Sequence, residues 1–391
     1  MTSAILALNL GSSSIKSALY EAETLNVIER GTITGFGDRP RAQFRPADGD
    51  MPESTLPARA GTDECLDWLL LRLRERRPEV RLAAVGHRVV HGGARFDRPA
   101  HITEQVLAEL ETYSPLAPAH QPVALAAIRL VGSRLPRTPQ VACFDTAFHR
   151  TQPKLAQSFA LPRGLTESGV IRYGFHGLSY EYIAGVLPDI AGECAHGRVI
   201  VAHLGHGASL CALRDLRSVA TSMGFTPLDG LMMGTRCGSL DPGVLLYLMR
   251  ERGMSPSQLE ELLGKQSGLL GVSGLSDDVQ TLEASDDPNA REALEMFADR
   301  AAAAISQHCS ALGGLDGLVF TAGIGERSGR VRASICDRLK WIGVTLDTAA
   351  NACHAQHISP PESSVKVLVV PTDEETVIAR GARNLIGPPP E

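Results

Sequence analysis

The feature of this sequence that most constrains its fold is an internal repeat. When the chain is moved along itself by about 194 positions, residues 5–19 (ILALNLGSSSIKSAL) align with residues 199–213 (VIVAHLGHGASLCAL). Each segment is an apolar strand, one polar residue, Leu-Gly with a turn of small residues, and a second apolar run. Either two strand-turn-strand units are alike by chance, or the chain is a duplicated fold whose two hairpin turns face each other across a cleft.

Both turns have a composition suited to phosphate. Glycine lets the backbone approach an anion closely, and successive N–H groups and small hydroxyls can surround it. In the first turn the candidate phosphate contacts are three serines and a lysine: Ser12, Ser13, Ser14 and Lys16. A solvated polar hairpin is the alternative. Neither a Walker A pattern nor a Rossmann G-x-G-x-x-G occurs, so a phosphate site here would be of another kind.

Composition and charge exclude several function classes. The 391 residues, 43% of them hydrophobic, can bury the core of roughly two to three domains. A formal net charge of -6 gives no general attraction to nucleic acid or to an acidic membrane surface. No apolar run reaches the ~20 residues of a membrane span, and the eight cysteines are scattered without zinc-like spacing. We therefore expect a cytoplasmic protein that binds neither nucleic acid nor membrane.

Apolar strand-like runs alternate with amphipathic helical stretches, which is the pattern of an α/β protein. The predicted strands are residues 5–8, 83–85 with 89–90, 199–202, 318–321 and 365–370. The predicted helices are residues 64–76, 104–111, 289–312 and 374–385. Residues 35–61 are rich in Gly, Pro, Arg and Asp and are predicted to form an irregular surface segment.

A series of segments resembles, in order, the signature segments of acetate kinases: NLGSSSIK, GHRVVHGG, CFDTAFH, RYGFHG, VIVAHLGHGAS, TSMGFTPLDGLMMGTRCGSLDP, GVSGLSDD, FTAGIGE and PTDEETVIAR. They run from residue 9 to residue 380, so the resemblance covers nearly the whole chain. Each segment alone would be a weak signal, but the ordered combination is specific. The sequence is therefore identified as a member of the acetate kinase family.

The resemblance implies both a fold and an activity. The family belongs to the acetate and sugar kinase, Hsp70 and actin superfamily. It implies an α/β, duplicated two-lobe, actin-like ATPase (ribonuclease H-like) fold with the nucleotide in the interlobe cleft, and a homodimer. The expected N-terminal lobe is residues 1–148, completed by the C-terminal helix 376–391, and the nucleotide-binding C-terminal lobe is residues 149–375. The implied reaction is reversible phosphoryl transfer between ATP and acetate, giving acetyl phosphate and ADP.

Phosphoryl transfer needs positioned positive charge, because negative charge spreads over the equatorial oxygens of the transferring group. The resemblance implies that Arg88 and Arg236 hold the carboxylate and the transferring group, a role that a planar guanidinium suits. It implies that His176 stabilises the transition state, that His120 is a second active-site histidine, and that Asp145 organises arginine and Mg2+. Taken singly, such residues are more often surface arginines or structural histidines.

Asn9 and Glu374 match the positions that the family uses for magnesium. Mg2+ accepts a few hard oxygen ligands supplemented by water and nucleotide phosphates. Mn2+ is the alternative ion. Without the resemblance, Glu374 would be interpreted as an exposed acid at a helix N-terminus.

The resemblance implies that ATP or ADP contacts both turns and the segments FTAGIGE and GVSGLSDD. The implied nucleotide-binding residues are Ser12, Ser14, Lys16, His203, Gly205, His206, Gly207, Asp278, Val279, Gln280, Ala322, Gly323, Ile324 and Arg327. Three of them depart from the family pattern: His206 and Arg327 replace asparagines, and Gln280 replaces an arginine. These departures bear on nucleotide affinity and adenine selectivity.

The acyl pocket, next to Arg88, should be small and apolar, and the matching positions are Val90, Ala119, Phe175 and Pro227. Many acetate kinases have leucine at the position of Ala119. A smaller side chain leaves room for another methylene, and one buried methylene is worth only about 1 kcal/mol. Propionate is therefore an alternative substrate.

Two other function classes stay open. A catalytically weak or regulatory relative would fit the departures in the nucleotide segments, and it would bind nucleotide without turnover. An actin- or Hsp70-like ATPase would not need Arg88, Arg236 and His176 to act on a carboxylate, and it would hydrolyse ATP without one.

Overall fold

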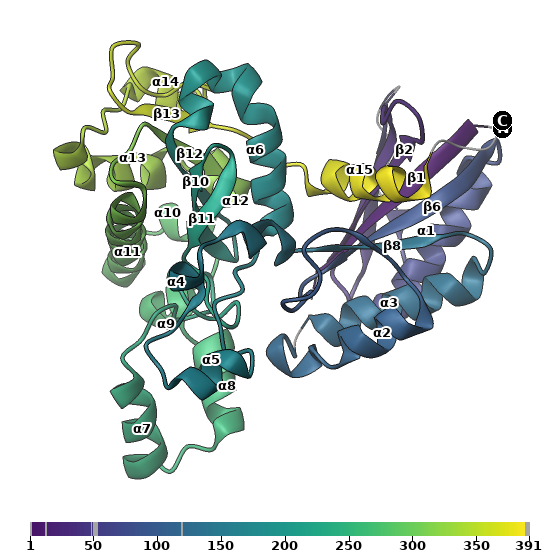
Figure 1. The fold of residues 1–391 in the computed structure, drawn as a ribbon, viewed down its shortest axis with the longest axis horizontal. Helices are drawn as coiled ribbons and strands as arrows, with labels where there is room; N and C mark the ends of the chain where they lie inside the picture. Colours follow the sequence, from purple (N-terminus) through teal and green to yellow (C-terminus); the bar gives the residue numbers. More distant parts are fainter. Residues whose placement is uncertain (1, 12–13, 48, 50–53, 119, 388–391) are drawn as a thin grey trace. The chain divides into compact units, whose positions relative to one another are not determined.

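The computed structural model describes residues 2–11, 14–47, 49, 54–118 and 120–387. The chain forms two compact units (Figure 1). Unit 1 comprises Met1–Phe148 and Asp373–Glu391, and unit 2 comprises His149–Thr372. Within the described residues, no helix has the length and apolar character that crossing a membrane requires.

Unit 1 is built on a mixed sheet in the order β5-β4-β3-β2-β1-β6-β8-β7. Its strands are β1 (Thr2–Leu10), β2 (Ser14–Glu21), β3 (Val27–Thr34), β4 (Arg41–Pro46), β5 (Ser54–Thr55), β6 (Val80–Val89), β7 (Ala100–His101) and β8 (Gln140–Phe144). Strands β1 to β5 pair antiparallel, whereas β1, β6 and β8 run parallel. Every residue of β1 from Ala4 to Leu10 is buried, as expected for a central strand with helices on both faces.

Helices of unit 1 pack against this sheet. The helices of unit 1 are α1 (Thr62–Arg76), α2 (Glu104–Glu111), α3 (Gln121–Arg134) and α15 (Glu374–Ile386). Leu6 and Leu8 of β1 share a core cluster with residues of α1 and α3. Helix α15, yellow in Figure 1, contacts β1, β6 and β8. It lies so close to β6 that a Cβ on Gly86 would be 2.6 Å from Cγ2 of Ile378, so this late segment of the chain belongs to the core of unit 1.

Unit 2 has its own sheet, in the order β11-β10-β9-β12-β13. The strands are β9 (Arg198–Leu204), β10 (Ala208–Arg214), β11 (Arg217–Thr221), β12 (Gly317–Thr321) and β13 (Lys366–Val369). Helix α11 (Pro288–Leu312) contacts β9, β10 and β11, while α6 (Gly177–Ala191) and α12 (Ala322–Arg327) contact β9. The remaining α-helices are α4 (Lys154–Gln157), α5 (Arg163–Glu167), α7 (Pro242–Glu251), α8 (Pro256–Lys265), α9 (Gly268–Ser273), α10 (Val279–Glu283), α13 (Gly329–Arg338) and α14 (Thr348–Ala352).

The two sheets share one topology. The orders β3-β2-β1-β6-β8 and β11-β10-β9-β12-β13 correspond strand for strand, with three antiparallel strands followed by two parallel ones. Each aligned segment is a hairpin, closed at Leu10 and Ile15 in unit 1 and at Leu204 and Ala208 in unit 2. The sequence repeat is therefore a structural repeat, and the predicted duplicated fold is confirmed.

The prediction of an irregular surface segment over residues 35–61 is wrong in part. Strand β4 pairs over its full length with residues Glu29–Thr34 of β3. Its residues alternate between the core and solvent, with Ala42 and Phe44 buried. Phe44 stacks on Trp68 of α1, with ring centroids 5.9 Å apart. The apolar positions are too few and too closely flanked by Gly and Pro to stand out in the sequence.

Candidate active site

Asn9, Arg88 and Asp145 lie together at the carboxyl ends of the three parallel strands of unit 1. Asp145 follows β8 directly, and its backbone N–H donates to the carbonyl oxygen of Val89 (3.1 Å). Arg88 donates from Nε to Oδ1 and Oδ2 of Asp145 (3.1 and 3.0 Å) and from Nη2 to Oδ2 (2.6 Å). Its Nη1 donates to Oδ1 of Asn9 (3.1 Å). Ligands of open α/β sheets bind at this edge.

Arg88 and Asp145 form a largely buried ion pair, with side-chain exposures of 17% and 1%. Burial alone would lower the pKa of Arg88, but the neighbouring Asp145, Glu374 and Glu375 carboxylates raise it above the ordinary value. Among the described residues, three of the five N–H donors of this guanidinium are committed to Asp145 and Asn9. Two donors remain for a ligand oxygen.

Two acids at the start of α15 meet Asn9. Its Nδ2 donates to Oε2 of Glu374 (2.8 Å) and to Oε1 of Glu375 (3.2 Å). Burial raises the pKa of Glu375, and Glu374 raises it further, whereas Lys16 opposes the shift. Sequence reasoning missed Glu375. The motif PTDEET shows three adjacent acids, but only the position of α15 on the sheet reveals that Glu374 and Glu375 approach Asn9.

A second cluster lies in unit 2 beside the β9–β10 turn. His176 has left-handed backbone geometry (φ 58°) just before α6, and its ring stacks on that of His203 with centroids 4.2 Å apart. Nδ1 of His176 lies 2.9 Å from Oγ of Ser209, and Nδ1 of His203 lies 2.8 Å from Oγ of Ser179. The hydroxyl of Tyr180 also bonds to Ser209. Sequence reasoning missed these three hydroxyl residues: Ser209 ends the motif VIVAHLGHGAS, whereas Ser179 and Tyr180 lie just beyond the motif RYGFHG.

Arg236 reaches the same turn. A Cβ placed on Gly207 would lie 3.3 Å from Nε2 of His176 and 3.7 Å from Nη1 of Arg236. Nη1 of Arg236 also donates to the carbonyl oxygen of Pro227 (3.1 Å). Backbone hydrogen bonds join the loop that carries this arginine to residues 267–269. The glycine at position 207 therefore leaves space in which the imidazole and the guanidinium approach the turn together.

Most of the predicted nucleotide residues of unit 2 line one cavity of about 510 Å³. The lining residues are Gly205, His206, Asp278, Val279, Gln280, Glu283, Gly323, Ile324, Arg327 and Ser328. The cavity has the size of small-molecule sites. Glu283 and Ser328 were not predicted, and Oγ of Ser328 donates to Oε1 of Glu283 (2.5 Å). Glu283, the last residue of α10, was missed because it lies beyond the GVSGLSDD motif.

Other predicted site residues lie elsewhere in their units. Ser14 begins β2, and Lys16 is exposed on that strand. Ala322 is buried at the start of α12 with a positive φ of 65°, an unusual geometry for a residue with a side chain. His120 is half-buried at the N-cap position of α3. Ser12 lies outside the described residues.

The predicted acyl-pocket residues come from both units. Val90 follows β6 in unit 1 and is 4% exposed. Phe175 in unit 2 is 1% exposed, and its carbonyl oxygen lies 2.9 Å from Nε2 of His149. Ala119 lies outside the described residues. The size of an acyl pocket therefore stays a prediction.

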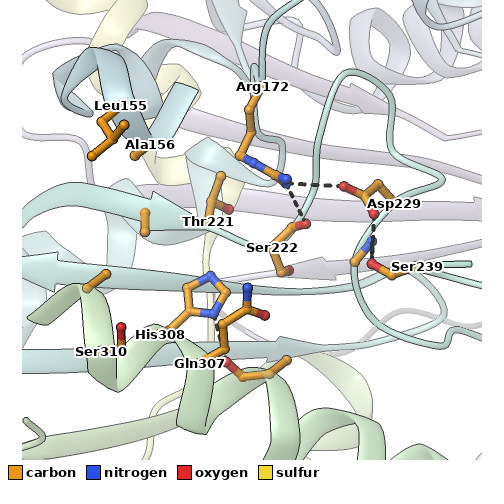
Figure 2. A pocket seen from close by; sticks show the side chains of 14 residues that line it. Leu155, Ala156, Arg172, Thr221, Ser222, Asp229, Ser239, Gln307, His308 and Ser310 are labelled. Carbon is orange, nitrogen blue, oxygen red and sulfur yellow. Dashed lines mark hydrogen bonds and ion pairs between the residues drawn. The ribbon is translucent and has the colours of Figure 1, made fainter. Parts of the chain in front are cut away.

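A further cavity of unit 2, of about 570 Å³, has no predicted site residue in its lining (Figure 2). Nη1 of Arg172 donates to the carbonyl oxygen of Ser222 (2.9 Å) and to Oδ2 of Asp229 (3.2 Å). Ser239 donates to Oδ1 of Asp229 (2.8 Å). Burial lowers the pKa of His308, and its Nδ1 bonds to a backbone carbonyl of its own helix. The Arg172 guanidinium and the Asp229 carboxylate therefore pair with each other.

Comparison with known proteins gives one consistent result. A family model described as the acetokinase family matches residues 4–380. An acetate kinase from Rhodopseudomonas palustris is 54% identical, over 97% of this chain and 98% of its own. The crystal structure of a propionate kinase from Francisella tularensis has a TM-score of 0.91 at 36% identity, covering 98% of this chain and 99% of its own. That of Porphyromonas gingivalis acetate kinase has a TM-score of 0.87 at 36% identity, covering 98% and 100%.

The duplicated sheets, with their hairpins and clustered polar side chains, place this protein in the class with an actin-like ATPase fold. Within that class, the match over residues 4–380 and the 54% identity to a relative of nearly equal length are specific to one family. The chain belongs to the acetokinase family. The family resemblance inferred from the sequence motifs is confirmed.

Proposed function

We propose that this protein catalyses reversible phosphoryl transfer between ATP and acetate, giving acetyl phosphate and ADP. Its family and its 54% identity to an acetate kinase support this reaction. The structural observation that carries the proposal is Arg88, a largely buried guanidinium held by Asp145 and Asn9, with two N–H donors left over by the described residues. A carboxylate needs such a planar, fixed pair of donors to be oriented.

The chemistry explains why the site is cationic. A carboxylate oxygen forms the new bond to the γ-phosphorus while the bond from that phosphorus to the bridging oxygen of ADP breaks. The attacking oxygen is already an anion at neutral pH, so no general base is required. The barrier lies in bringing two anions together and in the charge on the equatorial oxygens. Arg88 would orient the carboxylate, and Arg236 would neutralise the transferring group.

His176 would act as a hydrogen-bond donor. Burial raises the pKa of Tyr180 well above its usual value, so its hydroxyl stays protonated and can donate to Ser209. Ser209 can then donate to Nδ1 of His176. This chain of donors favours the tautomer that carries its proton on Nε2, the nitrogen nearest Gly207. The imidazole would stabilise phosphoryl charge without transferring a proton, as would His120.

The nucleotide would occupy the 510 Å³ cavity of unit 2. The glycines at positions 205 and 207 allow phosphate oxygens close to the backbone of the second turn. Gly323 and Ile324 of α12 would lie against the nucleoside, and Asp278 of the α10 segment would accept hydrogen bonds from it. In the first turn, Ser14 and Lys16 would meet the terminal phosphates.

The oxygen atoms of the side chains around Asn9 suit Mg2+. Glu374 and Glu375 bring two carboxylates to one amide, which matches the few hard oxygen ligands that Mg2+ takes from a protein. Glu374 would hold the ion with help from Asn9, and Mn2+ could replace it. The ion would supply positive charge that neutralises phosphate oxygens. The described residues contain no group of three His, Cys, Asp or Glu side chains that could hold a metal, so phosphates and water would complete its coordination.

Propionate is the second candidate substrate. Two observations favour it: alanine at position 119, next to His120, and the close likeness to a propionate kinase structure. One methylene changes selectivity by only about tenfold. We therefore expect both acids to be accepted.

The test is trapping of acyl phosphate with hydroxylamine, starting from ATP, Mg2+ and acetate, propionate or butyrate. Acyl hydroxamate should form with acetate and with propionate, and it should disappear when EDTA replaces Mg2+. Butyrate, with two more methylenes than acetate, should react least. Hydroxamate from none of the acids would contradict the proposal. ATP hydrolysis independent of carboxylate would instead indicate an ATPase, and nucleotide binding without turnover would indicate a regulatory relative.

The proposal includes a homodimer, formed through α7. This helix has no buried residue, although Leu246 and Tyr247 are half exposed (50% each) and Met249 is 43% exposed. Apolar side chains gathered on one exposed helix mark an interaction surface. A second copy of the chain is the occupant that the family relationship favours.

Light scattering after size-exclusion chromatography tests the dimer. The wild type should have about twice the chain mass of 41.7 kDa, and the double substitution Leu246→Asp and Tyr247→Asp should reduce it to the mass of one chain, because two carboxylates cannot be buried without partners. Leu71→Asp, which changes a leucine of α1 that is 56% exposed, is the matched control. A dimer that survives the double substitution would exclude α7 as the interface.

A further inference from the structure

His206 forms a side-chain pair with Asp277 at the candidate nucleotide cavity. It lies in the β9–β10 turn and lines the 510 Å³ cavity. Its Nε2 is 2.9 Å from Oδ2 of Asp277, and the two side chains are 59% and 43% exposed. This pair joins the turn to the segment before α10, which is 71 residues away in sequence.

The bond to Asp277 and the nearby Gly234 define the orientation of the ring. A Cβ placed on Gly234 would lie 2.7 Å from Cδ2 and 2.9 Å from Nε2 of His206. The Cδ2–Nε2 edge therefore faces Gly234 and Asp277, and the Nδ1 edge points away from both. The backbone is held as well, because the N–H of Gly234 donates to the carbonyl oxygen of His206 (3.1 Å). Among the described residues, the bond to Asp277 is the one hydrogen bond of this ring.

Several charged side chains belong to the elements around His206. Asp277 pairs with it directly, and Asp278 and Glu283 belong to the α10 side of the cavity. Two cations oppose them: Arg327 lines the cavity from α12, and Arg236 lies on the loop that contains Gly234. Because Asp277 accepts the proton of Nε2, a neutral ring would present a lone pair at Nδ1. Only the imidazolium presents an N–H there.

We propose that nucleotide binding draws a proton onto His206, with Asp277 accepting from Nε2 and a nucleotide phosphate oxygen accepting from Nδ1. A neutral Nδ1 would repel the phosphate, so the phosphate can bind there well only after the ring takes a proton from solvent. Asp277 is then a positioning residue that also stabilises the imidazolium. Histidine is the side chain whose charge changes between about pH 5 and 8. The inference rests on the proposed nucleotide site and adds proton linkage to it.

Calorimetric titration with Mg-ADP in two buffers of different ionisation enthalpy measures this linkage directly, without any turnover. Wild-type protein should take up a few tenths of a proton per nucleotide near pH 7. Its Kd for ADP should rise about threefold to tenfold between pH 6.5 and 8.5. His206→Asn should show neither effect beyond the proton exchange of the nucleotide itself.

Two further variants complete the test. Asp277→Asn keeps an acceptor for Nε2 but removes the negative charge. Proton uptake on ADP binding should therefore be smaller and should occur at lower pH. His196→Asn is the matched control, because His196 and Asp215 form a similar exposed pair (2.7 Å) that does not line the cavity, and it should behave as wild type. If His206→Asn takes up as many protons as the wild type, the inference is overturned while the proposed nucleotide site stands. Absence of ADP binding by the wild type would overturn the proposed nucleotide site and the inference with it.

Discussion

Replacing Arg88 with alanine is expected to lower kcat/KM for acetyl phosphate formation by about two to three orders of magnitude. The guanidinium is largely buried, so its contacts with a ligand oxygen are little weakened by water. Arg88→Lys should lose nearly as much, because an ammonium cannot bond to Asp145, Asn9 and a carboxylate in one plane. The measurement is steady-state kinetics of hydroxamate formation.

Stability must be separated from catalysis in this experiment. Alanine at position 88 leaves Asp145, which is 1% exposed, without its cation, and an unpaired buried charge is strongly destabilising. The lysine variant keeps a positive charge there and should fold as the wild type does. Arg134→Ala is the matched control, since Arg134 forms a similar forked pair with Asp67 but at exposures of 55% and 37%. Full activity in Arg88→Lys would contradict the proposed role.

Replacing Arg332 with methionine is expected to lower the free energy of unfolding of unit 2 by roughly 3 to 5 kcal/mol. Arg332 is 0% exposed, and all five of its N–H groups donate to neutral acceptors. Nη1 bonds to the carbonyl oxygens of Gly325 and Glu326, while Nε and Nη2 bond to Asn351 and His354. Methionine keeps much of the volume but leaves buried carbonyl groups without donors.

Urea unfolding followed by circular dichroism measures the loss, and hydrogen exchange locates it. Amides of α12 and of residues 347–354 should exchange faster than in the wild type, because Arg332 is the link between them. Arg330→Met on the same helix, where the side chain is exposed, should change stability by less than about 0.5 kcal/mol. An Arg332→Met variant as stable as that control would show that the carbonyl groups find other donors.

The bounds of a helix could be predicted nearly correctly where capping residues mark both of its ends. The expected helix at residues 289–312 is α11 to within one residue at its start, because Asp287 caps it, Pro288 opens it and Gly313 ends it in left-handed geometry. Strand β3 was not predicted. Glu29 interrupts its apolar pattern, yet this side chain is only 4% exposed because Arg76 and Arg77 pair with it. In the sequence, a buried acid of this kind looks like a surface residue, because its arginine partners come from a distant segment of the chain.

The same limit applies to the candidate site. Motifs indicate Arg88, Asp145 and His176 because each lies in a short recognisable segment. They cannot indicate that Arg88 and Asp145 pair across 57 residues, since parallel strands bring distant segments to one edge. Nor can they separate Arg332 from a surface arginine, because its acceptors are backbone carbonyl groups that only the folded chain brings together.

The position of α15 sets an order of events during synthesis. Residues 149–372, which form the whole of unit 2, leave the ribosome before the helix that covers β1, β6 and β8 of unit 1. Unit 1 begins the chain and yet is the last to be completed, contrary to the usual N-terminal-first order of domains. Until Ile378 reaches Gly86, an apolar face stays open to chaperones, and Asn9 lacks both of its glutamates. A nascent chain therefore cannot bring Asn9, Glu374 and Glu375 together before this helix emerges.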